Sequence, residues 1–319
     1  MGVRFATLQG TRSREATVRA ILIINPASGG GDKAGEIPEL AARYPWIEVR
    51  EPRAPGDIER LTRAACEEGY DAVLVAGGDG AVSATIDGIP AHARGVKLGI
   101  VPAGEVVPCT GGHDFAGGLG IPSDPAGALE IIAAGRTIRA DVMRLRKGRI
   151  EVTRLLNAAS GGLSSALDEK MDSDMKSRWG RLAYLVAALR SLGDVTMYDV
   201  TLDLDGEEVR ARACAVIVAN GPRAGGQELV STADITDHFL DVVIVTAETF
   251  AERALLAAAF LAGTHLRAEG IIFRRARKVR IDARPPMSFH GDGEDIGETP
   301  LELELEPAAV EVFVPATRT

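Results

Sequence analysis

Two glycine-rich segments of the chain each follow a run of apolar residues that is typical of a buried strand. Asn25–Gly31 (NPASGGG) follows the run Arg19–Ile24, and Gly77–Gly80 (GGDG) follows Ala72–Ala76. Glycines let backbone N–H groups come close to phosphate oxygens, and a helix that begins at such a turn adds partial positive charge there. Both turns would lie at the carboxyl ends of parallel strands, where open α/β sheets bind their ligands. The two segments together predict a phosphate-binding site that is neither a P-loop nor a GxGxxG site, because both of those motifs are absent.

A third segment with the chemistry of an active site is His290–Asp295 (HGDGED). Asp292 and Glu294 could orient a hydroxyl group and help to hold Mg²⁺, since carboxylates serve both purposes. Asp-Gly is also a strong signal for a hairpin turn. The spacing alone favours an acidic hairpin turn over an active site.

The elements that must position these segments change in character near residue 141. Before it, strand-like and helix-like runs alternate, which predicts a three-layer α/β domain with a parallel sheet covered on both faces. After it, strand-like runs follow one another closely and predict a β-sandwich or β-rich domain. These strands are expected at 142–146, 151–158, 196–204, 209–219, 240–246, 278–282 and 301–306, and helices at 177–192 and 250–262.

Composition and charge exclude several classes of protein. The chain has 319 residues, of which 46% are hydrophobic, and a net charge of −9, so bulk nucleic-acid binding is not expected. The longest apolar stretch, Leu255–Gly263, is too short to cross a bilayer, and residues 1–18 lack the apolar core of a signal peptide. Three scattered cysteines agree with a reducing compartment. A cytoplasmic protein with a loose tail at residues 1–18 is expected.

The order of the motifs resembles that of the diacylglycerol-kinase-like lipid kinases, which include the bacterial soluble lipid kinases and the sphingosine kinases. Asn25–Gly29 is similar to the family's NPxSG, Gly77–Gly80 to the start of GGDGT, and Asp114–Ala116 to the end of GTxNDFAR. Asp141 falls at the family's acidic position that opens the second domain. The segments 218–221, 225–226, 237–242 and 291–294 follow in the family's order, so the resemblance covers about residues 20–315.

The resemblance implies a two-domain enzyme with its active site in the cleft between the domains. Residues 19–141 would form the nucleotide-binding domain, to which residues 308–319 return, and residues 142–307 would form the lipid or substrate domain. ATP and Mg²⁺ are the implied cofactors. A lipid or a related alcohol is the implied acceptor of the phosphoryl group.

Carried over by position, the resemblance also assigns roles to single residues. Asp292, Glu294 and Asp79 would be the catalytic acids. Asp237 would hold a structural Mg²⁺ ion that is linked through water and Asp141 to the reaction centre. The nucleotide phosphates would be lined by Asn25, Ser28, Gly30, Gly77, Gly78, Gly80 and Gly104.

The chain departs from the family's motifs at the expected nucleotide site. Ala81 replaces the Thr of GGDGT, and nine residues, instead of three, separate Gly104 from Asp114. Gly117 stands in place of the Arg that closes GTxNDFAR, and His238 in place of a Gly before the Leu-Asp pair. Three interpretations are open: a kinase for an unusual lipid or a different phosphate donor, a kinase for a soluble alcohol, and a homologue that binds lipid or nucleotide as a regulator.

Two further features bear on the partners. The stretch Arg267–Arg284 carries seven Lys and Arg residues against Glu269 and Asp282. It could contact the inner face of a membrane, but a solvated strand face paired with acidic neighbours is slightly favoured. The apolar positions of residues 177–192 favour core packing over membrane insertion. The sequence is also compatible with a homodimer.

Overall fold

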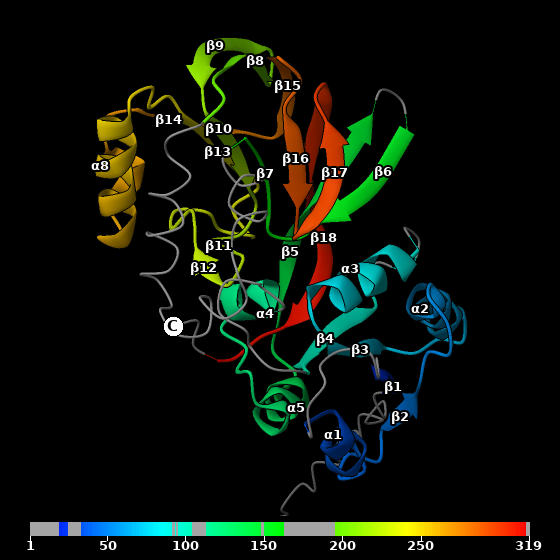
Figure 1. Ribbon diagram of the computed structural model, residues 1–319. Coiled ribbons are helices and arrows are strands. Elements are labelled where there is room, and N and C mark those ends of the chain that lie inside the picture. The colour runs from blue at the N-terminus through cyan, green and yellow to red at the C-terminus, as the bar shows by residue number, and fades with distance from the viewer. Residues whose placement is uncertain are drawn as a thin grey trace, which may run out of the picture.

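A computed structural model of the chain describes residues 19–24, 33–90, 93, 95–103, 113–147, 150–162 and 195–316. It has an α/β half, drawn in the lower part of Figure 1, and a β-rich half, drawn in the upper part. This agrees with the predicted combination of an N-terminal α/β domain and a C-terminal β-sandwich. The predicted tail at 1–18 and the predicted helix at 177–192 lie outside the described residues.

The α/β half is built on four parallel strands in the order β2-β1-β3-β4. Alternate residues of β1 are buried on opposite faces: Leu22 packs in the cluster that contains α1 and α5 residues, and Ile23 in the cluster that contains Ala65 of α2. Helices therefore cover both faces, which explains the continuous apolar runs in the sequence. The elements are β1 (Ala20–Ile24), α1 (Lys33–Ala41), β2 (Ile47–Arg50), α2 (Asp57–Glu67), β3 (Ala72–Gly77), α3 (Asp79–Gly88), β4 (Lys97–Pro102), α4 (Asp114–Gly118) and α5 (Pro125–Ala134).

Two long strands, β5 (Thr137–Lys147) and β18 (Leu301–Phe313), connect the halves (Figure 1). They pair antiparallel along their length, from Phe313 opposite Thr137 to Glu302 opposite Arg146. The last residues of β18 also pair with β4 of the α/β half, and its first residues pair with β15 (Lys278–Arg284). β5 passes without a break through the expected domain boundary at 141–142, so one sheet of ten strands extends through both halves.

The β-rich half packs this sheet against a second one with the strand order β14-β13-β10-β7-β16-β17. Met143 and Leu303 of the first sheet share a core with Val218 and Phe289 of the second, as in a β-sandwich. The remaining strands are β6 (Ile150–Leu155), β7 (Ala158–Gly162), β8 (Tyr198–Leu204), β9 (Glu207–Ala213), β10 (Ala215–Ala219), β11 (Arg223–Ala224), β12 (Gln227–Glu228), β13 (Leu240–Val245), β14 (Ile271–Ala276), β16 (Ser288–Gly291) and β17 (Glu294–Glu298). Among the described residues of this half, the helical segments are α8 (Phe250–Leu261) and the 3₁₀ turn His265–Arg267.

Two expected strands are each divided in the structure. Residues 209–219 form the end of β9 and the whole of β10, which belong to different sheets, because the chain crosses the sandwich at Cys214. Residues 151–158 form β6 and the start of β7, and the break at Leu156 and Asn157 leaves backbone amides that pair with the candidate site instead of with a neighbouring strand. In the part of the chain that the structure describes, no helix is long and apolar enough to cross a membrane.

Candidate functional site

The bend between β3 and α3 presents backbone with little side chain around it. β3 ends at Gly77, Gly78 is the extended residue before the helix, and α3 begins at Asp79. A Cβ atom on Gly80 would meet no atom within 4 Å, so a ligand can approach the helix start closely. The other predicted phosphate ligands, namely Asn25, Ser28, Gly30 and Gly104, lie outside the described residues. Whether the two glycine-rich bends converge stays a prediction.

The carboxylate of Asp79 ties this bend to α4. Its Oδ2 accepts a hydrogen bond from the backbone N–H of Asp114 at 2.8 Å, and its Oδ1 accepts one from Phe115 at 3.1 Å. The residue is only 9% exposed. Asp79 thus positions the first turn of α4, and its expected catalytic role stays a prediction.

Asp114 carries this chain of contacts into the β-rich half. Both of its carboxylate oxygens accept the backbone N–H of Gly226, at 3.0 and 3.1 Å, and Arg223 Nε lies 3.9 Å from Oδ1. Burial raises the pKa of Asp114, and the nearby negative charge of Asp79 adds to the shift. Asp114 is not among the site residues expected from the sequence, where its only signal is its place at the end of the GTxNDFAR-like motif.

Asp292 lies at the tip of the β16–β17 hairpin in the left-handed conformation, with φ of 49°. Its Oδ2 accepts the backbone N–H of Leu156 at 2.5 Å, and its Oδ1 accepts those of Asn157 and Ala158 at 3.0 and 3.1 Å. Burial, with a smaller contribution from the negative charge of Asp79, raises its pKa to about 6, although the three hydrogen bonds act in the opposite direction. Asp292 and Asp79 therefore belong to one electrostatic site.

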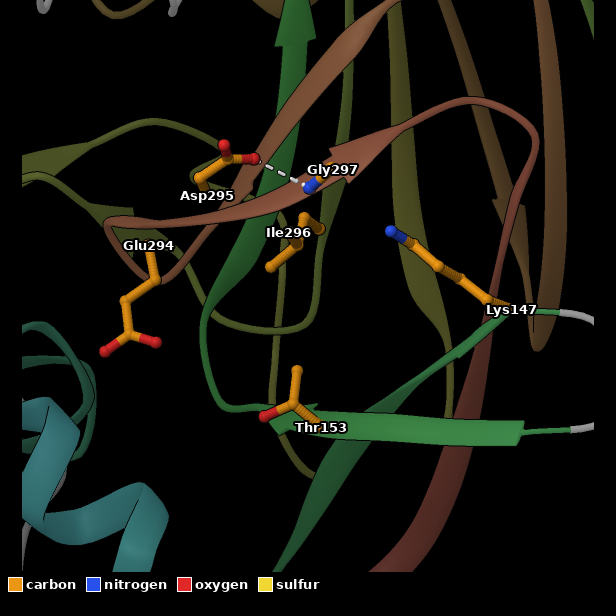
Figure 2. Close-up of a pocket in the computed structure, with 6 residues that line it drawn as sticks. All are labelled: Lys147, Thr153, Glu294, Asp295, Ile296 and Gly297. Atoms are coloured by element: carbon orange, nitrogen blue, oxygen red, sulfur yellow. Dashed lines mark hydrogen bonds between the residues drawn. The ribbon is translucent and has the colours of Figure 1, made fainter.

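Glu294 lies two residues further along the same hairpin and differs from Asp292 in its surroundings. Its side chain is exposed, and Figure 2 shows its carboxylate directed toward α3. It lines a hollow of about 420 Å³ together with Lys147, Thr153, Asp295, Ile296 and Gly297. Asp295 points the other way and accepts the backbone N–H of Gly297 at 2.7 Å (Figure 2). HGDGED thus forms the hairpin turn that its spacing favoured, and the turn presents two differently placed carboxylates.

Asp141 is fully buried where the two halves meet. Its carboxylate accepts the backbone N–H of Ala308 at 2.7 Å and that of His238 at 2.9 Å, and the His238 ring Nδ1 lies 2.9 Å from Oδ1. His238 has φ of 64°, a conformation that suits the glycine of the family motif. The histidine that replaces this glycine therefore adds a ring nitrogen as a partner for Asp141.

Asp237 is paired with a cation of the chain itself. The guanidinium of Arg275 contacts Asp237 Oδ2 and, at 2.9 Å, Oδ1 of the buried Asp241, which lies directly opposite Arg275 on the neighbouring strand. Arg275 also stacks over the ring of Phe239, with 4.9 Å between its Cζ and the ring centroid.

Among the described residues, no group of three or more His, Cys, Asp or Glu side chains is arranged to hold a metal ion. The carboxylates of Asp237 and Asp141 already have partners, respectively Arg275 and the pair His238 and Ala308. This donor set does not fit the structural Mg²⁺ ion that the sequence resemblance assigned to it.

Comparisons with known proteins cover almost the whole chain. The model of the diacylglycerol kinase catalytic domain matches residues 19–145, and that of the YegS C-terminal NAD kinase beta sandwich-like domain matches residues 157–314. The diacylglycerol kinase of Staphylococcus carnosus (strain TM300) is 26% identical over 302 residues, 93% of this chain and 95% of that protein. That of Staphylococcus aureus (strain MRSA252) is 27% identical over 303 residues, 93% of this chain and 92% of that protein.

Solved structures show the same fold. A protein from Bacillus anthracis str. Sterne superposes with a TM-score of 0.78 at 23% identity, covering 96% of this chain and 99% of that one. A structure described as a diacylglycerol kinase from the same organism superposes with a TM-score of 0.69 at 20% identity, covering 93% and 97%.

The contacts of Arg275 predict that the stability of the nucleotide-free protein does not depend on divalent cations. Thermal unfolding in excess EDTA and in excess MgCl₂ should give the same Tm. Arg275→Met should lower the free energy of unfolding by about 3 kcal/mol, the lower end of the range for a broken buried ion pair, because 41% of the arginine side chain is exposed.

The exposed Arg280 of β15 supplies the matched control, since Arg280→Met removes an equal charge without uncovering Asp241. A Tm that rises with MgCl₂ in the unmodified protein would contradict the interpretation that Arg275 takes the place of a metal.

Proposed function

The chain belongs to the diacylglycerol-kinase-like family of lipid kinases, and on that premise we propose that it uses ATP and Mg²⁺ to phosphorylate the hydroxyl group of a lipid. Membership makes it a lipid-kinase-like phosphotransferase; the nucleotide, the metal and the acceptor are the proposed parts. The observation that carries the proposal is Asp292, a carboxylate with a pKa of about 6 that three backbone amides hold near the start of α3.

The hydrogen bonds of Asp292 support a role as proton acceptor. A carboxylate oxygen has two lone-pair directions. Oδ1 uses both, for Asn157 and Ala158, while Oδ2 uses one, for Leu156. The second lone pair of Oδ2 can accept the hydroxyl proton of the acceptor, and a pKa near 6 keeps the group ionised yet basic at neutral pH.

The α3 start is proposed to bind the phosphates of ATP. Gly77, Gly78 and Gly80 bring backbone close to the ligand, and the ten-residue helix that follows favours negative charge at its first turn. Asn25, Ser28, Gly30 and Gly104 are proposed as further phosphate ligands.

The Mg²⁺ ion is proposed to be held beside these phosphates. Glu294 fits it because its carboxylate is exposed and directed toward α3 (Figure 2), with Asp292 two residues away. When bound, the ion would neutralise charge on the transferred phosphoryl group.

The hollow beside Glu294 favours a second candidate acceptor. Lys147 and Thr153 make part of its lining polar, so it suits a headgroup or a soluble alcohol better than an acyl chain. Lys147 Nζ approaches so close to Gly297 that a side chain there would displace it. A kinase for a soluble alcohol is therefore the alternative, and it differs from the first in needing no vesicle or detergent.

The basic stretch Arg267–Arg284 gives little support for membrane contact. Lys278 pairs with Glu302 at 3.0 Å, and Arg275 is held by Asp237 and Asp241. Arg275 of β14 and Lys278 of β15 thus have acidic neighbours, as expected for a solvated strand face.

The proposed function predicts ATP-dependent phosphorylation of a lipid hydroxyl. ADP release should be measured with diacylglycerol, a sphingoid base and a prenyl alcohol in mixed micelles, and with glycerol in buffer. Turnover with a lipid is the expected result. MgATP at about 100 times its Kd should also stabilise the fold by about 2.7 kcal/mol. Binding of lipid without any turnover would favour the regulatory interpretation, and turnover with a soluble alcohol alone would favour the second candidate.

A comparison of Asp292 with Glu294 tests the proton acceptor. Asp292→Asn should lower kcat by about a hundredfold or more, because the general base is lost. It should also lower the Tm, since the amide NH₂ group would face backbone donors. Glu294→Gln should lower kcat with little change in the Tm, because the side chain is exposed. A fully active Asp292→Asn variant would contradict the assignment.

The raised pKa of Asp292 predicts the acid limb of the pH profile. The carboxylate must be ionised to accept a proton, so kcat/KM should fall below pH about 6 as Asp292 becomes protonated. Initial rates at fixed ionic strength measure the limb, and Glu294→Gln should keep its midpoint. A midpoint near the ordinary aspartate pKa of about 4 would show that Asp292 is not the group that titrates.

A further inference from the structure

The candidate site carries an excess of negative charge that a nucleotide would meet. Asp79 and Asp114 are 9% and 5% exposed, and the charge of Asp79 raises the pKa of both Asp114 and Asp292. Phosphate oxygens near these carboxylates are repelled unless a cation lies between them. Because the proposed function places a triphosphate here, a positively charged side chain of the protein would offset this repulsion in addition to Mg²⁺.

Arg223 of β11 lies against the α/β half at this place. A Cβ atom on Gly117 of α4 would be 3.3 Å from Arg223 Nε and 3.9 Å from its Cζ. The adjoining Gly118 lies in the same way under Pro222, with 3.5 Å between such a Cβ and the proline Cδ. The β11–β12 hairpin can thus pack on α4 because both helix positions lack a side chain.

The neighbours of Arg223 orient its guanidinium but accept only part of its hydrogen-bond donors. Nη2 donates to the carbonyl of Gly226 at 3.1 Å, and Nε lies 3.9 Å from Asp114 Oδ1, a distance for charge attraction without a hydrogen bond. Arginine has five N–H donors, and 37% of this side chain is exposed. The guanidinium of Arg223 therefore has further N–H donors for an anion, while the carbonyl of Gly226 orients its plane.

We propose that Arg223 binds the phosphates of the nucleotide from the β-rich half of the protein, a role that rests on the proposed function. Its guanidinium lies over Gly117, the position at which the GTxNDFAR motif carries an arginine. One positive charge is thereby supplied to α4 by a residue 106 positions further along the chain. Nucleotide binding then requires that the hairpin and α4 remain in contact.

A purely structural role for Arg223 gives different expectations. An arginine that only fastens the hairpin to α4 would affect the Tm and would affect ligands with and without phosphates alike. If Arg223 contacts phosphate, its loss weakens the binding of ligands that carry phosphates and leaves the binding of adenosine unchanged. Adenosine and the Mg²⁺ complex of the β,γ-imido analogue of ATP are therefore the two probes.

The test measures the Kd of both probes by calorimetry for four variants of the full chain. Arg223→Ala should weaken binding of the imido analogue roughly tenfold or more and leave adenosine binding unchanged. Arg223→Lys keeps the charge but loses the planar guanidinium, so its Kd for the imido analogue should lie between those of the unmodified protein and of Arg223→Ala. The double variant Gly117→Arg with Arg223→Ala, which returns the arginine to α4, should recover part of the affinity. Arg210→Ala on β9, where the side chain is 74% exposed, is the control.

The outcomes separate this inference from the proposed function. An unmodified protein that does not bind the imido analogue overturns both. Normal binding by the unmodified protein, with Arg223→Ala no weaker than Arg210→Ala, overturns the role of Arg223 alone. An equal loss for adenosine and for the analogue also overturns it, because it shows a structural role.

Discussion

The pairing of β5 with β18 is the constraint on which the position of the site depends. The pairing is continuous except between Glu306 and Val310, where the register shifts. Ala308 at this bulge has φ of 50° and donates its N–H to the buried carboxylate of Asp141 on the opposite strand. Because β18 also pairs with β4 on one side of the bulge and with β15 on the other, Asp141 stabilises the place where the α/β sheet continues into a face of the sandwich. The start of α3 and the hairpin that carries Asp292 are thereby set relative to one another.

Within that frame, the acidic residues of the site act first as hydrogen-bond acceptors for backbone. Asp79 fixes the start of α4, Asp114 fixes Gly226, and Asp292 fixes the break between β6 and β7. Each contact orders a segment that would otherwise end in unpaired buried N–H groups. Burial raises the pKa of Asp114 and of Asp292, and this makes Asp292 a better base than a solvated aspartate. The hydrogen bonds therefore orient these carboxylates and stabilise the fold, while burial, against the effect of the hydrogen bonds, raises the pKa that the proposed chemistry uses.

Patterns within short stretches predicted much of this molecule, while contacts between distant stretches were beyond them. The continuous apolar run of β3 and the alternating burial of β15 are local signals of a covered and of a half-exposed strand. α5 is not among the elements expected from the sequence, although it has local signals, with Asp124 as its N-cap and Gly135 after its last residue. In contrast, Arg223 with Gly117 and Asp141 with Ala308 are brought together only by the tertiary fold. HGDGED shows the limit clearly, since the spacing predicts the turn but not that the carboxylate of Asp292 is partly buried while that of Glu294 is exposed.

The departures from the family motif have physical counterparts elsewhere in the fold. His238 occupies a left-handed position that suits glycine, and its ring joins the contacts of Asp141. Gly117 leaves room that the guanidinium of Arg223 enters. Ala81 is 6% exposed and packs in the core with Phe115. The methyl group of alanine suits these apolar neighbours better than the hydroxyl of a threonine would. A comparison of the motif residue by residue shows only that the family's residue is missing at these three positions. His238 contributes its own ring to the contacts of Asp141, Arg223 from another segment lies over Gly117, and Ala81 contributes to packing, so the altered motif is compatible with the proposed phosphate site.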